Sequence, residues 1–236
     1  MIIGLQQEGV HNQNLNKTGQ RIIQGGSWKK QRVILLIPAG TSIPTKVYLS
    51  HCGLIFPPNQ GAFRMACIGM EVGEAFSNAI NDILGHPELS TWEYLLTIEH
   101  DNMPPQDGLL RLLERMEEHK EFSAIGGLYF CKGPGGCAQI WGDPKDPQLN
   151  FRPQVPDPTG KLIECCGTGM GFTLWRLKTF KDPKLRKPWF KTLAGKDGVG
   201  TQDLYFWGDA RKYGYRCAVD CSVKVGHYDL ANDVVW

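Results

Sequence analysis

The chain has 236 residues, of which 42% are hydrophobic and 21% are charged, so it is long enough for a soluble domain with its own core. Its net charge of +2 is too small to predict a surface that binds duplex nucleic acid. The longest aliphatic run, residues 33–37, is far shorter than the roughly 20 residues of a membrane span, and the N-terminus lacks the features of a signal peptide. We therefore expect a cytoplasmic protein without a membrane span.

Eight cysteines occur at positions 52, 67, 131, 137, 165, 166, 217 and 221. Neither the pair Cys131/Cys137 nor the pair Cys217/Cys221 has the two-residue gap that is usual in a zinc knuckle. We expect these thiols to be reduced and to pack as small hydrophobic side chains rather than to bind zinc.

The first elements of the chain begin after a polar lead-in. Residues 1–31 are rich in Gln, Asn and Gly, and we expect them to form a loosely ordered arm before a single domain at 32–236. The apolar run at 33–37 is followed by Pro and Gly, which predicts a buried parallel strand and its loop. Residues 47–56 fit either a strand or a helix, and residues 64–70 predict another strand.

Two helices and two strands follow. Apolar residues recur at spacings of three and four over 71–84, which predicts an amphipathic helix. A strand is expected at 92–98, a helix from Pro104 to Met116, and a strand at 124–130. This alternation of strand and helix predicts a mainly parallel sheet with helices on both faces.

The second half has a different composition. Residues 131–160 are rich in Gly, Pro and Asp, which predicts loops. Residues 162–174 fit a strand and a turn, residues 201–213 a helix with Thr201 as its N-cap, and residues 217–225 a last strand of alternating pattern.

Two acids follow the predicted strand at 92–98. Glu99 and Asp101 are separated only by His100, so strand geometry places both carboxylates on one side. In an open parallel sheet, ligands bind at this carboxyl edge of the strands. Carboxylate oxygens suit Mg²⁺ or Mn²⁺, which would offset the charge of a departing diphosphate. The alternative interpretation is a solvated acidic turn.

His227 and Asp203 are further candidates. His227 follows the last predicted strand, and it would complete a metal's ligand shell if that strand returned beside Asp101. Asp203 lies in the first turn of the predicted helix at 201–213, where an acid also favours the helix dipole. Its functional interpretation is a general base that takes a proton from an acceptor hydroxyl.

Glycine and tryptophan are frequent between residues 141 and 207. Gly167, Gly169 and Gly171 alternate along one segment, which permits close backbone approach to a ligand but lacks the spacing of a dinucleotide fingerprint. Tryptophans occur at positions 141, 175, 189 and 207. Sugar rings stack on aromatic faces, so we interpret Trp189, in a Pro-Trp-Phe loop, as a candidate acceptor contact; the alternative is core packing.

In this order, the features resemble the GT-A glycosyltransferases, especially the broad family-2-like group, over residues 33–229. The segment Leu35-Leu36-Ile37-Pro38-Ala39 is similar to the family's first strand, whose end holds the nucleotide base. Residues 73–80 resemble a helix that carries an Arg-Asn pattern near the nucleotide; Ser77 stands where Arg is commoner, and Asn78 remains.

The segment from Leu96 to Pro105 looks like the family's Asp-x-Asp motif and the start of the following helix. The resemblance implies that Asp101 is a direct metal ligand. Glu99 replaces the usual first Asp, and it would reach the ribose or a metal-bound water. His227 matches the late His that some members use as a third metal ligand.

The acceptor side carries two more matches. Residues 169–174 resemble the glycine strand under the acceptor site. Gln202-Asp203 resembles the Glu-Asp pair that provides the base in inverting members, with Gln in place of Glu. The resemblance does not separate an inverting from a retaining reaction, in which Asp203 would only orient the substrate.

Taken together, the resemblance implies an α/β, Rossmann-like GT-A fold: a mainly parallel central sheet flanked by helices, with a nucleotide-binding half at about 32–130 and a loop-rich acceptor half at about 131–236. The expected activity is a metal-dependent transfer of a sugar, a hexose by expectation, from a nucleotide sugar such as a UDP-sugar to an acceptor hydroxyl. The cofactor would be Mn²⁺ or Mg²⁺, and the acceptor a saccharide, a small molecule or a modified base in DNA. The residues expected to contact the nucleotide sugar are Pro38, Ala39, Gly40, Thr41, Asn78, Glu99, His100 and Gly169. Those expected to contact the acceptor are Trp189, Gly171 and Gln202.

Other classes of protein remain open at this stage. A nucleotidyltransferase would share the sheet and the acid pair, but it usually needs a basic Gly-rich loop, and no basic residue follows the first strand until Lys46. A non-catalytic module that binds sugar or nucleotide is the second alternative. The third is a glycosyltransferase that modifies nucleic acid, for which the cations between 181 and 196 would form the contact surface. These cations are Lys184, Arg186, Lys187, Lys191 and Lys196.

Overall fold

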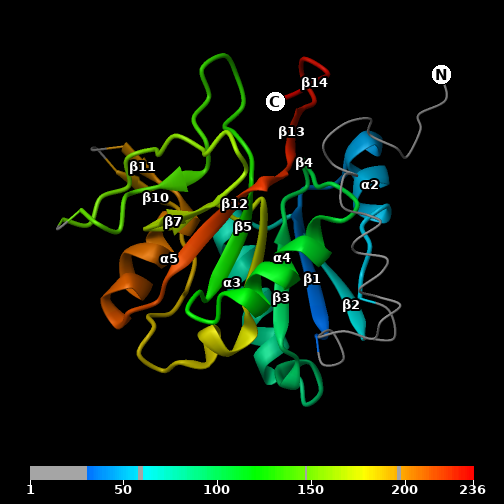
Figure 1. Ribbon diagram of the computed structural model, residues 1–236. Helices are drawn as coiled ribbons and strands as arrows, with labels where there is room; N and C mark the ends of the chain where they lie inside the picture. The colour runs from blue at the N-terminus through cyan, green and yellow to red at the C-terminus, as the bar shows by residue number, and fades with distance from the viewer. Residues whose placement is uncertain (1–30, 58–60, 147, 196–197) are drawn as a thin grey trace.

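A seven-stranded central sheet organises the part of the chain that the computed structural model describes, which is residues 31–57, 61–146, 148–195 and 198–236 (Figure 1). The predicted N-terminal arm therefore lies outside the described residues, apart from Gln31. The strand order is β2-β1-β3-β9-β5-β12-β7. The strands are β1 (Val33–Ala39), β2 (Ala62–Ile68), β3 (Tyr94–Ile98), β5 (Ala124–Leu128), β7 (Leu162–Cys165), β9 (Phe172–Arg176) and β12 (Cys217–Lys224).

The expectation of a mainly parallel sheet is confirmed. Strand β1 pairs in parallel with β2 and β3, and β5 pairs in parallel with β12. Strand β9 lies between β3 and β5 and is antiparallel to both, and the edge strand β7 is antiparallel to β12. Five of the seven strands therefore run in one direction, and their carboxyl ends meet at one edge of the sheet.

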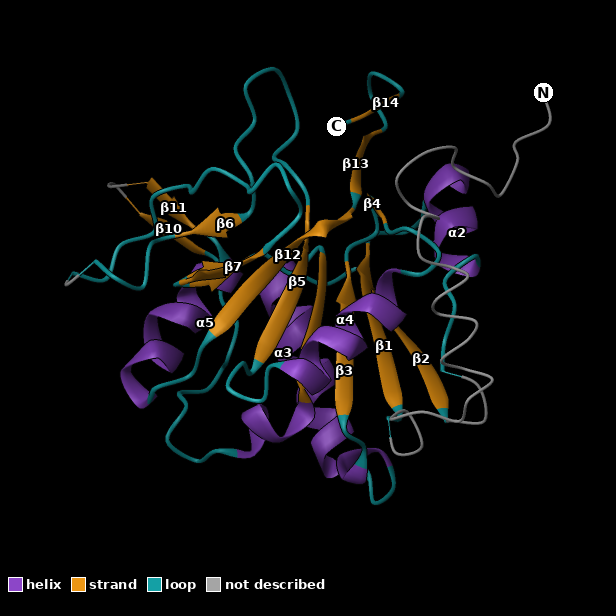
Figure 2. Ribbon diagram, in the orientation of Figure 1, coloured by secondary structure: helices purple, strands orange, loops and turns teal. Residues whose placement is uncertain are grey.

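Helices cover both faces of this sheet (Figure 2). The α-helices are α2 (Thr45–Cys52), α3 (Val72–Gly85), α4 (Gly108–Glu118) and α5 (Gln202–Ala210), and the 3₁₀ helices are η2 (Leu89–Thr91), η3 (Leu177–Lys181) and η4 (Arg211–Tyr213). Side chains alternate along a strand, so Ile34 and Leu36 of β1 pack with α3 and α5, whereas Val33 and Leu35 pack with α4. None of the described helices has the length and hydrophobicity that crossing a membrane requires.

Short strands build the upper part of the molecule in Figure 1. They are β4 (Asn102–Met103), β6 (Ile140–Trp141), β8 (Gly167–Thr168), β10 (Leu193–Gly195), β11 (Gly198–Gly200), β13 (Gly226–Asp229) and β14 (Val234–Val235). Strand β13 pairs with both β4 and β14, and β6 pairs with β8. The end of the chain thereby returns beside the segment that follows β3.

Several element boundaries differ from the sequence-based prediction. The ambiguous segment at 47–56 contains the helix α2, which begins at Thr45. The helix expected from Pro104 begins at Gly108, and the strand and turn at 162–174 are divided among three strands, β7, β8 and β9. Thr201 holds the N-cap position of α5 as expected, but its side chain makes no capping hydrogen bond.

The tryptophans of the second half belong mostly to the core. Trp175 and Trp207 are fully buried and stack with their ring centroids 5.3 Å apart. Trp189 is only 2% exposed, and its ring meets Phe180 edge to face at 5.9 Å. The interpretation of Trp189 as an acceptor contact is therefore wrong for this structure, because core packing leaves no ring face for a sugar.

Candidate functional site

A cavity of about 240 Å³ lies at the carboxyl edge of the parallel strands. It forms between the loop after β1, the start of α3 and the loop after β3, so it brings together two segments that the sequence singled out separately. Its lining residues are Pro38, Ala39, Gly40, Met70, Val72, Glu99, His100 and Asp101. Thr41 is exposed and does not line the cavity.

Asp101 and His227 meet beside this cavity. Strand β13 pairs His227 with Asn102, and the backbone N–H of Tyr228 donates to the Asp101 carbonyl oxygen at 2.7 Å. This pairing brings His227 Nε2 to 3.4 Å from Asp101 Oδ2. The other ring nitrogen, Nδ1, lies 2.7 Å from the carbonyl oxygen of Phe130, to which it donates. That hydrogen bond orients the ring so that Nε2 faces the carboxylate.

Lys132 also contacts Asp101, and the sequence analysis missed it. Its Nζ lies 2.5 Å from Asp101 Oδ2, the same oxygen that faces His227. Burial opposes ionisation of Asp101, but the contacts with His227 and Lys132 outweigh it and hold the pKa of this carboxyl well below its usual range. The one sequence signal was position: Lys132 follows the predicted strand at 124–130 and starts a glycine-rich loop.

Glu99 and the start of α5 form the second part of the site. Gln202 Nε2 lies 3.4 Å from Glu99 Oε1, which links the loop after β3 to the helix. Burial and the nearby charges of Asp101 and Asp203 raise the pKa of Glu99 to about 8. Asp203 is 5% exposed, its Oδ1 accepts from the backbone N–H of Leu204 at 2.8 Å, and burial raises its pKa.

Tyr129 lies close enough to these carboxyl groups for their charges to act on it. It is buried, and its hydroxyl accepts a hydrogen bond of 2.8 Å from the backbone N–H of Gly171. Burial, together with the charges of Glu99 and Asp203, raises the pKa of this hydroxyl well above its usual value. Sequence reasoning did not identify Tyr129, because a tyrosine at the end of a buried strand is an ordinary core residue.

Two of the alternating glycines, Gly169 and Gly171, leave no room for a Cβ beside Tyr129. A Cβ on Gly169 would lie 2.1 Å from the Tyr129 hydroxyl oxygen. A Cβ on Gly171 would lie 2.4 Å from Asn102 Oδ1 and 2.6 Å from Tyr129 Cζ. The Gly171 carbonyl oxygen also accepts a hydrogen bond of 3.2 Å from the backbone N–H of Glu99. The glycine segment therefore packs its backbone directly against the residues that hold the acids.

Asn78 is not brought into the cavity. It is exposed on α3, and its Nδ2 lies 3.9 Å from the sulfur of Met70, which does line the cavity. Its expected contact with the nucleotide sugar therefore has no direct geometric support.

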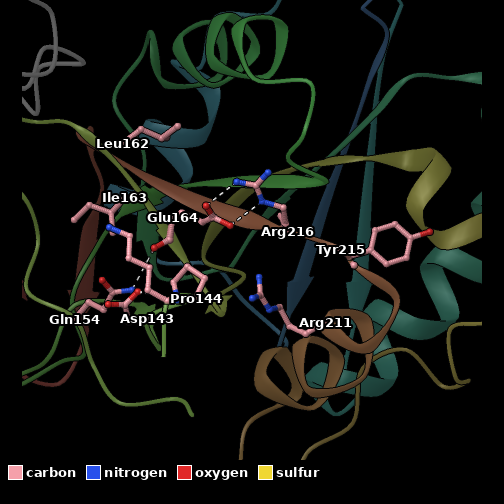
Figure 3. A pocket seen from close by; sticks show the side chains of 11 residues that line it. Asp143, Pro144, Gln154, Leu162, Ile163, Glu164, Arg211, Tyr215 and Arg216 are labelled. Atoms are coloured by element: carbon pink, nitrogen blue, oxygen red, sulfur yellow. Dashed lines mark hydrogen bonds and ion pairs between the residues drawn. The ribbon is translucent and has the colours of Figure 1, made fainter. Parts of the chain in front are cut away.

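A second, larger cavity of about 630 Å³ lies at the far end of α5, between β7, η4 and the turn at Asp143 (Figure 3). Figure 3 shows Arg216 and Glu164 facing each other there, joined by two hydrogen bonds of 2.8 and 2.7 Å. This cavity contains none of the predicted site residues. We place the candidate site at the smaller cavity, because only that one has the acidic groups at a parallel-strand edge.

The donor atoms beside the smaller cavity can be tested against a divalent cation. Asp101 Oδ2 and His227 Nε2 face each other, and the hydrogen bond from Nδ1 to Phe130 leaves Nε2 free to be a ligand. Among the described residues, no group of three or more His, Cys, Asp or Glu side chains could hold a metal ion. The two side chains fit a cation that takes its remaining ligands from phosphate and water, as Mg²⁺ commonly does.

Comparisons with known proteins support the fold. No protein family model matches the chain, and no curated protein sequence matches it. Among solved structures, the chain is similar to A197 from STIV, with a TM-score of 0.59 and 16% identity over 84% of this chain and 86% of that one. It is also similar to GalNAc-T7, solved with UDP, GalNAc and Mn²⁺, with a TM-score of 0.57 and 10% identity over 85% of this chain.

The chain spans 44% of the GalNAc-T7 chain. At these identities the likenesses show the fold alone, which is a Rossmann-like GT-A fold. Neither likeness places the chain in the family-2-like group that the sequence resembles.

Proposed function

We propose that the protein is a metal-dependent glycosyltransferase that moves a sugar from a UDP-sugar to an acceptor hydroxyl. The observation that carries this proposal is the meeting of Asp101, His227 and Glu99 beside a cavity at the parallel-strand edge of a GT-A fold. GalNAc-T7, which has the same fold, was solved with UDP, GalNAc and Mn²⁺, and this supports a UDP-sugar as donor and Mn²⁺ as cation. A hexose is the expected sugar.

Three groups have roles in donor binding under this proposal. Pro38 to Gly40 would contact the nucleotide along the cavity wall. Glu99 lines the cavity and is linked to Gln202 of α5, so it would contact a ribose oxygen or a metal-bound water. A divalent cation held by Asp101 and His227 would supply positive charge against the diphosphate as it leaves.

Asp203 is the proposed base. The acceptor oxygen attacks the anomeric carbon of the donor, the bond from that carbon to the diphosphate oxygen breaks, and the hydroxyl proton passes to the Asp203 carboxylate. Burial supports this role, because it raises the pKa of Asp203 and makes the ionised carboxylate a stronger base. Gln202 ties the start of α5 to Glu99 and so fixes Asp203 relative to the donor side.

A DNA acceptor receives less support than a saccharide or small molecule. Two of the cations proposed to contact it are engaged with the protein: Arg186 packs over the Tyr205 ring at 3.4 Å, and Lys187 lies over the Trp189 ring at 4.6 Å. Lys196 lies outside the described residues. Lys184 and Lys191 are exposed, which is also the ordinary state of a surface lysine.

Calorimetric titration of UDP and GDP, with and without Mn²⁺, tests the proposal. We expect UDP binding that requires Mn²⁺ and that is lost in Asp101→Ala. The control variant is Asp82→Ala, which removes an exposed acid near the C-terminal end of α3, whereas the cavity is lined by Val72 at the start of that helix. If neither nucleotide binds under any metal condition, the proposed donor class is wrong.

A further inference from the structure

The ion pair between Lys132 and Asp101 occupies the position where the proposed function needs a metal ion. Lys132 Nζ lies 2.5 Å from Asp101 Oδ2, and His227 Nε2 lies 3.4 Å from the same oxygen. A divalent cation held by Asp101 and His227 would bind at this same oxygen. An ammonium group and a divalent cation would then share one carboxylate oxygen at contact distance, where their charges repel.

The protein therefore contains an internal cation that competes with a metal ion for Asp101. Lysine can leave the carboxylate without unfolding anything, because its ammonium group sits on a flexible four-carbon chain. The Lys132 side chain is 35% exposed, so solvent already reaches it. The backbone just before Lys132 is held in place, because the Cys131 N–H donates to the Cys137 carbonyl oxygen at 2.9 Å.

The loop that carries Lys132 is fixed where it begins, while the Lys132 side chain is free to move. Phe130 pairs with Ala138, and the Phe130 carbonyl oxygen orients His227, so this end of the loop is fixed to the site. Beyond Lys132 the chain turns at Gly133 and Gly135, both with positive φ, and no atom lies within 4 Å of a Cβ placed on either glycine. The ammonium group can therefore move by several ångströms while its Cα stays next to the site.

Once the Lys132 ammonium group has left Asp101, the nearest negative charge available to it would be the diphosphate of the donor. It would share the cation with Asp101, which lines the cavity, so its oxygens would lie within the same few ångströms that Lys132 already reaches. We propose that Lys132 is an exchangeable counter-ion: it neutralises Asp101 in the free protein and transfers to the diphosphate when the divalent cation takes its place. This inference rests on the proposed function, and it assigns Lys132 as a diphosphate-binding residue.

The proposal predicts two opposite effects of Lys132→Met. Affinity for Mn²⁺ alone should rise about fivefold or more, because the competing charge has gone. Affinity for UDP at saturating Mn²⁺ should fall about tenfold, because a charge-assisted contact to phosphate has gone. Electron paramagnetic resonance of free Mn²⁺ measures the first quantity, and calorimetry measures the second.

Two further variants sharpen the experiment. Lys178→Met removes an exposed lysine from η3 and should change neither affinity. Lys132→Arg keeps the charge and should restore most of the UDP affinity. If the wild type binds Mn²⁺ and UDP, two results for Lys132→Met would overturn the role of Lys132 and leave the proposed function intact. One is a fall in both affinities, and the other is no change in either. Absence of Mn²⁺-dependent UDP binding in the wild type would overturn the proposed function together with it.

Discussion

Gly169→Ala gives a direct test of how the glycine segment and Tyr129 fit together. The new Cβ would lie 2.1 Å from the Tyr129 hydroxyl oxygen and 3.0 Å from Gln139 Oε1. Gly169 does not have a positive φ, so alanine meets no backbone strain and the cost comes from this contact. Forcing a methyl group into a packed core costs about 1–3 kcal/mol, and the lower entropy of the unfolded chain returns only about 0.4–1 kcal/mol. We therefore expect a net loss of roughly 1–2 kcal/mol in the free energy of unfolding.

The same reasoning predicts a rescue. Tyr129→Phe removes the hydroxyl, leaves the Gly171 N–H without its acceptor, and costs about 1–3 kcal/mol by itself. In that background the 2.1 Å contact is gone, and the remaining close atoms are Gln139 Oε1 at 3.0 Å and ring Cζ at 3.1 Å, which need shift by only a few tenths of an ångström. Gly169→Ala should therefore cost clearly less than in the wild type. Gly171→Ala should keep its full cost in the same background, because its Cβ meets Asn102 Oδ1 at 2.4 Å.

Urea denaturation followed by circular dichroism measures these free energies by linear extrapolation. The double-mutant cycle should give a coupling of about 1–2 kcal/mol between Gly169 and Tyr129. Strictly additive losses for Gly169→Ala and Tyr129→Phe would refute the claim that the hydroxyl is what requires glycine at 169.

Three further predictions concern the acids, the imidazole and the tryptophan. Asp203→Asn should lower the rate of sugar transfer by about 10²–10⁴ with UDP binding retained, as a UDP-release assay and calorimetry would show; an unchanged rate would remove Asp203 as base. The base must be ionised, and burial raises the pKa of Asp203 above the ordinary aspartate value of 3.8, so the wild-type rate should begin to fall at a pH above 3.8 as the solution is acidified. A rate that stays constant down to pH 3.8 would argue against Asp203 as the base. His227→Ala should weaken Mn²⁺ binding in the presence of UDP by about tenfold, and equal Mn²⁺ titrations for both proteins would contradict its role as a ligand. Trp189→Ala should cost about 3–5 kcal/mol in the free energy of unfolding, measured in urea, and a stable variant with weakened acceptor binding would restore the interpretation that the structure overturned.

The sheet and its acidic edge could be predicted because they depend on local sequence patterns. Residues 33–37 and 92–98 are apolar runs that end in a Pro–Gly loop and an acid pair, so hydrophobic pattern and turn residues define both strand and edge. Periodicity also placed the helix at 71–84, which the structure has at Val72–Gly85. These signals lie within a few residues of the feature that they predict.

The contacts between distant segments could not be predicted from the sequence. Lys132 stands 31 residues from Asp101, and its position after a predicted strand does not by itself identify Asp101 as its partner. Trp189 shows the opposite failure: the composition of its loop suggested an exposed ring, but packing against Phe180 buries it. In both cases the fold of the second half decides the outcome, and that half has little periodicity to read.

The antiparallel strand β9 explains why the site depends on such contacts. Its insertion between β3 and β5 brings the Gly171 backbone against Glu99 on one side and the Tyr129 hydroxyl on the other. The glycines therefore do more than permit a turn: Gly169 and Gly171 allow the segment before β9 to pass where a Cβ would clash with Tyr129 or Asn102.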